Sequence, residues 1–217
     1  MTDFAAARET MVDSQVRPSD VTRFPIIEAF LTVRREDFVP AHLRPVAYLG
    51  EHIELAPGRV LLDPRVFAKM LDAVAVGPND LVLDVGCGLG YSSAVLAHMA
   101  QAVIALEEDT AMVSDAENRL AAAGADNAVV EQGRLADGMP QHGPFDAIVI
   151  EGGVEQLPDT FQDQVKLGGR VAAIFTRERS GQAKLGVRVE EGLVWRRIFD
   201  ATAPVLPGFE AAKAFEF

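Results

Sequence analysis

Hydrophobic residues recur in a regular order along the last two-thirds of the chain, from residue 81 onward. Apolar runs bounded by turn-forming residues predict strands over 81–85, 101–106, 127–131, 145–150 and 170–175. Between them, Ala, Val and Leu at helical spacing predict helices over 91–100, 110–123 and 157–165. Such an alternation is typical of an α/β fold with a parallel sheet and helices on both faces.

The pattern changes after residue 175. Residues 184–189 and 194–199 alternate with a period of two around a short polar turn, which predicts a hairpin. Two such strands, added antiparallel at one edge, give a mixed sheet. The tail 203–209 holds two prolines and is therefore not expected to form a central strand.

The first 75 residues predict helices over 2–15, 22–33 and 64–75, the last of which begins at Pro64. Val39-Pro40 and Ala56-Pro57-Gly58 mark loops between them. These helices are too short to hold a core alone. We expect one domain over 1–217, in which the helical extension 1–78 folds over the core and hairpin of 79–217.

A glycine-rich turn follows the strand 81–85. Gly86, Gly88 and Gly90 carry no Cβ, so the backbone can turn tightly and approach a ligand closely. Cys87 lies within the turn, where a small side chain is needed, and Asp84 precedes it. An ordinary loop is the alternative interpretation.

The next strand ends in two acids, about twenty residues past the first glycine, where dinucleotide folds place the acid that binds ribose hydroxyls. Glu107 directly follows Leu106 and is our candidate over Glu108. A solvated acidic turn before a helix remains the alternative.

Two ligand classes share this arrangement of strand, turn, helix and acid. A dinucleotide site needs its third glycine at position 91, and Tyr91 stands there. The spacing G-x-G-x-G with an acid two residues ahead resembles the S-adenosylmethionine site of the methyltransferase fold. The resemblance implies cofactor contacts from the residues of the turn and its flanks: Asp84, Gly86, Cys87, Gly88, Gly90, Tyr91 and Glu107.

Charge and composition narrow the partners. The 20 Lys and Arg residues against 32 Asp and Glu give a net charge of −12, which opposes nucleic acid as the main substrate, although a local basic patch remains open. No apolar run of about 18 residues and no signal-peptide pattern is present, so we expect a cytoplasmic protein without a membrane partner.

The candidate metal ligands and nucleophiles are few. The four histidines lack metal-ligand spacing and there is one cysteine, so no metal is expected. A nucleophilic Cys87 is the minority alternative, since a helix N-terminus can lower the pKa of a thiol.

Taken together, the segments resemble the protein-L-isoaspartate O-methyltransferase family over nearly the whole chain. The matching segments are 11–17, 34–40 with Ala47-Tyr48, 82–96, 145–150 and 167–170. The resemblance implies a Rossmann-like methyltransferase fold, with 1–78 on the acceptor side and 79–217 as the cofactor-binding core. It also implies methyl transfer from S-adenosylmethionine to isoaspartyl carboxylates of damaged proteins or peptides. No catalytic residue is assigned, because a carboxylate is already ionised at pH 7 and needs no general base.

Three departures from the family pattern concern site residues. Leu62 stands where the family has a serine beside the acceptor, and Asp63 would repel an anionic acceptor if it pointed inward. Arg134 and Leu135 replace an Asp-Gly pair at the adenine, where a backbone contact or Asp137 could substitute. Glu151 replaces a small residue and adds negative charge.

Leu62 also supports two alternatives to isoaspartyl repair. The chain could methylate another acceptor, or it could be a binding module that keeps the cofactor and has lost catalysis. The sequence leaves the oligomeric state open.

Overall fold

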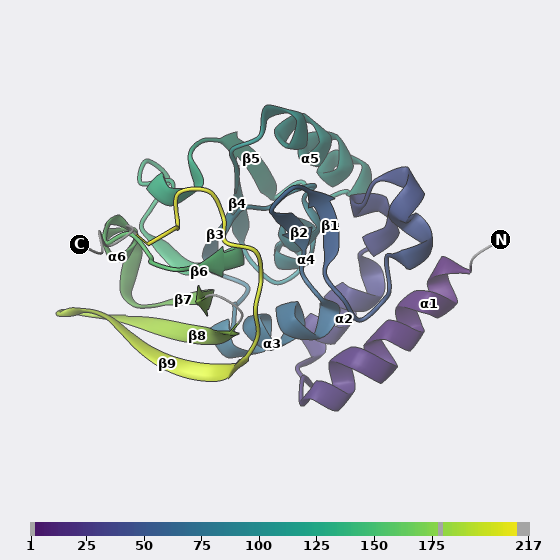
Figure 1. The fold of residues 1–217 in the computed structure, drawn as a ribbon, viewed down its shortest axis with the longest axis horizontal. Coiled ribbons are helices and arrows are strands. Elements are labelled where there is room, and N and C mark those ends of the chain that lie inside the picture. Colours follow the sequence, from purple (N-terminus) through teal and green to yellow (C-terminus); the bar gives the residue numbers. More distant parts are fainter. Residues whose placement is uncertain (1–2, 178–179, 212–217) are drawn as a thin grey trace, which may run out of the picture.

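The computed structural model describes residues 3–177 and 180–211, and it contains a seven-stranded sheet (Figure 1). The strand order is β5-β4-β3-β6-β7-β8-β9. The strands are β3 (Leu81–Val85), β4 (Ala102–Glu107), β5 (Ala128–Gln132), β6 (Phe145–Val154), β7 (Val165–Arg177), β8 (Ser180–Val189) and β9 (Gly192–Asp200). Strands β3 to β7 run parallel, whereas β8 and β9 are added antiparallel. The predicted mixed α/β sheet with an edge hairpin is therefore confirmed.

The helices between the strands are α4 (Tyr91–Ala97), α5 (Thr110–Ala123) and α6 (Thr160–Asp163). Helix α5 matches its prediction because both ends carry strong signals: the Asp109 carboxylate caps its first turn, and Gly124 ends it at φ 70°. Helix α4 ends three residues earlier than predicted. The helix predicted over 157–165 was wrong in length, because the Gln164 carbonyl already accepts a hydrogen bond from the Phe145 N–H at 2.7 Å and the chain enters β7 there.

The N-terminal extension contains α1 (Phe4–Met11), α2 (Phe24–Thr32) and α3 (Pro64–Val74). A π-helical turn over Val12–Val16 continues α1, and the predicted start at Thr2 lies outside the described residues. Two 3₁₀ segments, Arg35–Phe38 and Ala41–Val46, lie between α2 and α3.

The extension shares a hydrophobic core with the sheet. The rings of Phe30 and Phe67 lie 5.7 Å apart, and both pack against Tyr91 at the start of α4. The same core includes Val82 of β3 and Val103 of β4. The extension is thus fixed to the sheet by buried apolar contacts, which stabilise its position relative to the strands.

A small hairpin was missed by the sequence analysis. Strands β1 (Ile53–Ala56) and β2 (Arg59–Leu61) pair antiparallel around the predicted loop at Pro57 and Gly58. Gly58 adopts φ 72° in the turn, a conformation that favours glycine. Each strand is too short to give a periodic signal.

The C-terminal tail crosses the carboxyl ends of the strands (Figure 1, yellow). It meets β6 in a single bridge between Val205 and Gly153, with a Gly153 N–H to Pro204 carbonyl distance of 2.7 Å. The prediction that this proline-rich tail forms no central strand is confirmed.

Candidate active site at the carboxyl edge of the sheet

The sheet reverses its order of assembly beside β3. From β3 the chain adds β4 and β5 on one side and then returns to place β6 on the other. Ligands of open α/β sheets bind outside the carboxyl ends of the strands at such a switch point. Asp84, Glu107 and Glu151, which lie at or near the ends of β3, β4 and β6, meet there.

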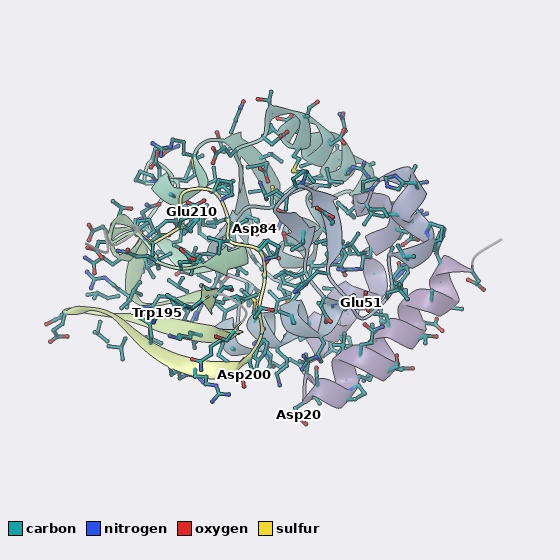
Figure 2. The ribbon with its side chains drawn as sticks, viewed as in Figure 1. Asp20, Glu51, Asp84, Trp195, Asp200 and Glu210 are labelled. Atoms are coloured by element: carbon teal, nitrogen blue, oxygen red, sulfur yellow. The ribbon has the colours of Figure 1, made fainter. Side chains whose placement is uncertain are left out.

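Asp84 is completely buried in the interior (Figure 2). Its Oδ2 accepts hydrogen bonds from the hydroxyls of Ser92 and Ser93 at 2.7 and 2.6 Å. Its Oδ1 has no hydrogen-bond partner among the described residues. Burial raises the pKa of Asp84 to about 6, although the two serine hydroxyls oppose the shift. A buried oxygen of this kind fits a ligand that brings a donor or a positive charge.

The glycine turn has the backbone that its sequence predicts. Gly86, Gly88 and Gly90 have φ values of 79°, 58° and 92°, so all three lie in the region that glycine favours. A Cβ at Gly88 would lie 2.9 Å from Leu55 Cδ1, and one at Gly86 would lie 3.1 Å from Leu206 Cδ1. The hairpin and the tail therefore cover the turn.

Glu107 binds the backbone around the turn. Its Oε1 accepts from the N–H groups of Glu108 and Asp109 at 2.8 and 3.0 Å, and its Oε2 accepts from the Gly88 N–H at 2.9 Å. The side chain has no exposed surface. The carboxylate thus joins the end of β4 to the glycine turn at the end of β3.

Arg59 is a site residue that the sequence analysis did not find. Its Nη1 donates to Glu107 Oε1 at 2.7 Å, and its Nη2 donates to Oε2. Burial works against the charge of Arg59, but the hydrogen bonds and charge of Glu107 outweigh it and raise its pKa. The only sequence signal was an arginine beside a glycine in an otherwise apolar segment.

The side chains of Tyr91 and Cys87 are both buried, Tyr91 against the N-terminal extension and Cys87 within the glycine turn. The Tyr91 ring is 1% exposed and packs among Phe30, Phe38 and Phe67, so its side chain faces the extension. Burial, the largest cause, raises the pKa of the Cys87 thiol well above its usual range. A protonated, buried thiol is a poor nucleophile, which argues against the minority interpretation.

The loop after β5 lies beside Glu107. The Gly133 N–H donates to the Glu107 carbonyl at 3.0 Å, and the Leu135 N–H lies 3.3 Å from a carboxylate oxygen of Glu108. Arg134 is exposed, whereas the Leu135 side chain is completely buried. Asp137, the substitute suggested for the family acid, is exposed.

Leu62 and Asp63 lie between β2 and α3. The Leu62 side chain is 1% exposed and belongs to the core, and its carbonyl accepts from Arg35 Nη2 at 2.7 Å. Asp63 Oδ1 accepts from the N–H groups of Arg65 and Val66 and so caps α3. The carboxylate that would repel an anionic acceptor if it pointed inward is therefore used as a helix cap.

Glu151 lies in a stretch of β6 where the pairing with β7 shifts register, between Val149 and Gly153. The residue is 5% exposed, and its Oε1 has no hydrogen-bond partner among the described residues. Burial, and then the charge of Asp84, raises its pKa well above the usual range of a carboxyl. The neutral form of Glu151 is favoured, which reduces the negative charge that it brings.

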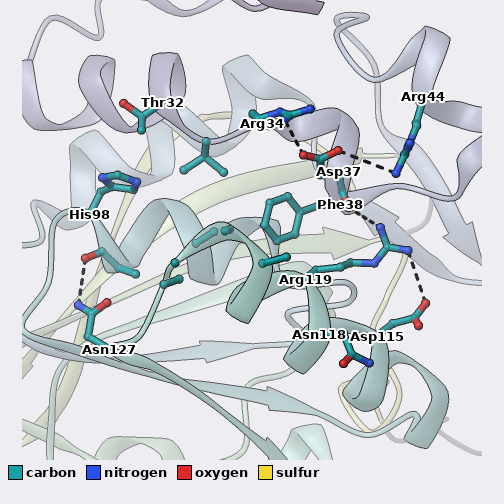
Figure 3. A pocket seen from close by; sticks show the side chains of 17 residues that line it. Thr32, Arg34, Asp37, Phe38, Arg44, His98, Asp115, Asn118, Arg119 and Asn127 are labelled. Atoms are coloured by element: carbon teal, nitrogen blue, oxygen red, sulfur yellow. Dashed lines mark hydrogen bonds and ion pairs between the residues drawn. The ribbon is translucent and has the colours of Figure 1, made fainter.

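A cavity of about 830 Å³ lies elsewhere, between the 3₁₀ segment at Arg35–Phe38 and helices α4 and α5 (Figure 3). Its arginines already pair with acids: Arg34 and Arg44 with Asp37, and Arg119 with Asp115. Its lining contains no residue of the glycine turn.

Within 3–177 and 180–211 no group of three acidic, histidine or cysteine side chains is arranged to hold a metal ion. In the same ranges no helix is long and apolar enough to span a membrane.

Comparison with known proteins decides the family. The family model described as protein-L-isoaspartate(D-aspartate) O-methyltransferase matches residues 7–202. The chain belongs to this family. It is accordingly a methyltransferase that uses S-adenosylmethionine, as the resemblance in the sequence implied.

Two relatives illustrate the match, and one solved structure shows the same fold. Protein-L-isoaspartate O-methyltransferase 1 of Rhodopseudomonas palustris (strain HaA2) is 35% identical over 83% of this chain and 74% of its own. The Koribacter versatilis (strain Ellin345) enzyme of the same name is 32% identical over 92% of this chain and 90% of its own. A Plasmodium falciparum structure in complex with S-adenosyl-L-homocysteine has a TM-score of 0.79 at 18% identity, over 95% of this chain and 99% of that one.

The residues of this methyltransferase fit its cofactor. The glycine turn offers a surface without Cβ atoms, and Asp84 Oδ1 is a buried acceptor without a partner in the described part of the chain. Glu107 lies at the end of β4, where open α/β folds place a ribose-binding carboxylate, and in this structure Arg59 and three backbone N–H groups donate to it. A cationic sulfonium matches the unpartnered oxygen of Asp84, and a carboxylate is the kind of acceptor that ribose hydroxyls use.

Proposed function

We propose that this methyltransferase transfers a methyl group from S-adenosylmethionine to the free carboxylate of isoaspartyl residues in damaged proteins and peptides. The observation that carries the proposal is the carboxyl edge of the sheet, where Asp84 and Glu107 flank the glycine turn in a chain of this family. When bound, S-adenosylmethionine supplies an electrophilic methyl group on a positively charged sulfur.

The donor side is assigned to the ends of β3, β4 and β5. Glu107 accepts the ribose hydroxyls, the glycines admit the cofactor to the backbone, and Asp84 faces its cationic part. Cys87 and Tyr91 contribute through their backbone, because the side chain of Tyr91 faces the aromatic cluster. The loop at Arg134 and Leu135 offers backbone groups to the adenine, and this contact replaces that of the family acid.

The acceptor side is assigned to the segment that joins β2 to α3. Arg35 holds the Leu62 carbonyl, and Asp63 is fixed by its cap on α3. Both contacts hold the backbone of this segment in place. Such rigidity matters, because orientation of the reacting groups can be worth up to about 7–11 kcal/mol of barrier.

The reaction requires no base from the protein. A carboxylate with a pKa near 4 is ionised at neutral pH and attacks as it is. The negative charge of the acceptor must still be tolerated near Asp84 and Glu151. Burial raises the pKa of Glu151 well above its ordinary value and so favours its neutral form. Asp84, with a pKa raised to about 6, is mostly ionised at neutral pH, and its charge suits the cationic part of the cofactor.

We also propose that the protein acts in the cytoplasm and that nucleic acid is not its methyl acceptor. The net charge of −12 opposes phosphate binding, and the single cysteine suits a reducing compartment. Fractionation of the source cells tests the location; recovery of the protein outside the cytoplasmic fraction would refute it.

Labelled methyl transfer tests the activity. The protein is incubated with methyl-labelled S-adenosylmethionine and either an isoaspartyl peptide or the same peptide with a normal aspartyl residue. We expect label in the isoaspartyl peptide alone. Transfer no greater than that of heat-inactivated protein would refute the assignment, and transfer to a different acceptor would favour another substrate.

A further inference from the structure

The guanidinium of Arg59 occupies the space above the first glycine of the turn. Its Nη2 lies 3.4 Å from the position that a Cβ on Gly86 would take. The same group forms its two hydrogen bonds with Glu107, and the two residues are 7% and 0% exposed. An arginine from the hairpin therefore lies in the part of the site that we assign to the ribose.

The Glu107 carboxylate cannot serve Arg59 and a ribose together. Three backbone N–H groups and two guanidinium N–H groups already donate to its two oxygens. A carboxylate offers about four lone-pair positions, so five donors already saturate it and two ribose hydroxyls can bind only in place of two of them. The backbone donors are fixed by β4 and the turn, and Arg59 is the donor that can leave.

A displaced Arg59 needs another anion, because a buried guanidinium without a partner is strongly unfavourable. The nearby acids are poor substitutes. Asp84 Oδ2 is taken by two serine hydroxyls, and we assign its unpartnered Oδ1 to the cationic part of the cofactor, so Asp84 is not available to Arg59 once the cofactor is bound. Glu151 already lies within the field of another buried cation, Arg35.

A buried cation on the acceptor side would stabilise an anionic acceptor. Arg59 lies three residues before Leu62, whose side chain is buried and carries no hydrogen-bond donor. The other buried arginine, Arg35, is held by the carbonyls of Ala47 and Leu62 and lies 4.8 Å from the centre of the Tyr91 ring. Arg35 Nη1 has no partner in the described part of the chain, but the other groups of Arg35 are fixed by these carbonyls. Arg59 is held through Glu107, the carboxylate that we assign to the ribose, and it lies on the strand that leads to the acceptor segment.

We propose that Arg59 exchanges partners during the reaction: it leaves Glu107 when the ribose takes that carboxylate, and it then binds the carboxylate of the acceptor. This inference rests on the proposed function. The exchange makes Arg59 a specificity residue for anionic acceptors, and it makes acceptor binding depend on prior cofactor binding.

Binding calorimetry with S-adenosylhomocysteine tests the exchange without turnover. Arg59→Gln removes the guanidinium that competes with the ribose for Glu107. The variant is therefore expected to bind S-adenosylhomocysteine about tenfold more tightly, within the usual range of coupling between sites. Wild-type protein loaded with S-adenosylhomocysteine is expected to bind an isoaspartyl peptide about tenfold more tightly than the unloaded protein, again within that range. Arg59→Gln is expected to lose this gain in peptide affinity. It is also expected to bind the peptide carboxylate no more tightly than the corresponding carboxamide.

Two further variants separate this role from a structural one. Arg170→Gln removes a partly buried ion pair with Asp80, outside the site. It is expected to leave the Kd for S-adenosylhomocysteine and the Kd for the isoaspartyl peptide unchanged. Arg59→Lys keeps the charge and loses the two-bond fork, so it is expected to show the same changes to a smaller degree and carries the test if Arg59→Gln does not fold.

The outcomes are distinct. Weaker S-adenosylhomocysteine binding by the Arg59 variants, or an unchanged carboxylate preference, would overturn the exchange while the proposed function stands. Failure of the wild-type protein to bind the isoaspartyl peptide in either state would overturn the proposed function and the acceptor half of the exchange. Tighter S-adenosylhomocysteine binding by Arg59→Gln would then still support competition between Arg59 and the ribose for the Glu107 carboxylate.

Discussion

The buried guanidinium of Arg35 donates a 2.7 Å hydrogen bond to the backbone carbonyl of Leu62. A second bond, also 2.7 Å, reaches the carbonyl of Ala47. Within the N-terminal extension, the side chain thus ties the 3₁₀ segment Arg35–Phe38 to the segment that we assign to the acceptor. The Leu62 side chain belongs to the core, and the position bears on function through its backbone.

Arg35→Lys is expected to loosen the acceptor segment. A lysine ammonium cannot bridge two carbonyls as the guanidinium does, so we expect a loss of about 2–4 kcal/mol in the free energy of unfolding. KM for an isoaspartyl peptide is expected to rise more than the Kd for S-adenosylhomocysteine. The matched control is Arg34→Lys, at a neighbouring and exposed position. Equal effects of the two variants on KM would contradict the assignment.

Glu107→Gln is expected to weaken cofactor binding and folding together. Charged hydrogen bonds contribute about 1.5–3 kcal/mol each, so the Kd for S-adenosylhomocysteine should rise about 10- to 100-fold. Arg59 would lose its buried counter-charge, at a cost of about 3–5 kcal/mol in the free energy of unfolding. Calorimetry and denaturant unfolding measure the two effects. Glu117→Gln, on the exposed face of α5, should change neither.

Gly88→Ala tests the need for a bare backbone in the turn. The added methyl would meet Leu55 Cδ1 at 2.9 Å on the face that is covered by the hairpin. Gly124→Ala imposes a similar strain at φ 70° with no atom within 4 Å. Both variants should lose about 1–2 kcal/mol of stability from the backbone alone. A tenfold rise in the Kd for S-adenosylhomocysteine, about 1.4 kcal/mol, is expected for Gly88→Ala only.

The shifted pKa of Asp84 predicts a pH dependence of stability for the free protein. The pKa rises from 3.8 to about 6 on folding, so the native state binds more protons than the unfolded state between these values. Its contribution to the free energy of unfolding is therefore largest below pH 4 and falls by about 2–3 kcal/mol as the pH rises through 6. The raised pKa of Glu151 acts in the same direction.

Denaturant unfolding between pH 4 and 7 measures this slope. Asp84→Asn should flatten it, since the amide does not titrate, whereas Asp13→Asn at an exposed position should leave it in place. A slope that is the same in Asp84→Asn as in the wild-type protein would contradict the account of Asp84.

The sequence predicted the parts of the site that are set by local chemistry. Apolar runs bounded by turn-forming residues located β3 and β4, and therefore the acid at or near the end of each. The spacing of Gly86, Gly88 and Gly90 predicted the turn, because each adopts a positive φ value that glycine takes without strain.

The rest depended on tertiary contacts. Arg59 lies on a three-residue strand, too short for a period, and its partner is 48 positions away. The inward direction of the Tyr91 ring is set by aromatic neighbours from the extension, and the environment of Glu151 by a register shift between β6 and β7. Helix α6 is shortened by the entry of the chain into β7. Single-sequence patterns carry no signal for such pairings.

The chemical position of the transferred methyl group tests the central claim most directly. After one round of transfer to an isoaspartyl peptide, fragmentation by mass spectrometry locates the methyl group, and mild alkali tests the bond. We expect a methyl ester on the isoaspartyl carboxylate that alkali removes. An alkali-stable methyl group on nitrogen or on a hydroxyl, or no methylated peptide from protein that binds S-adenosylhomocysteine, would contradict the account.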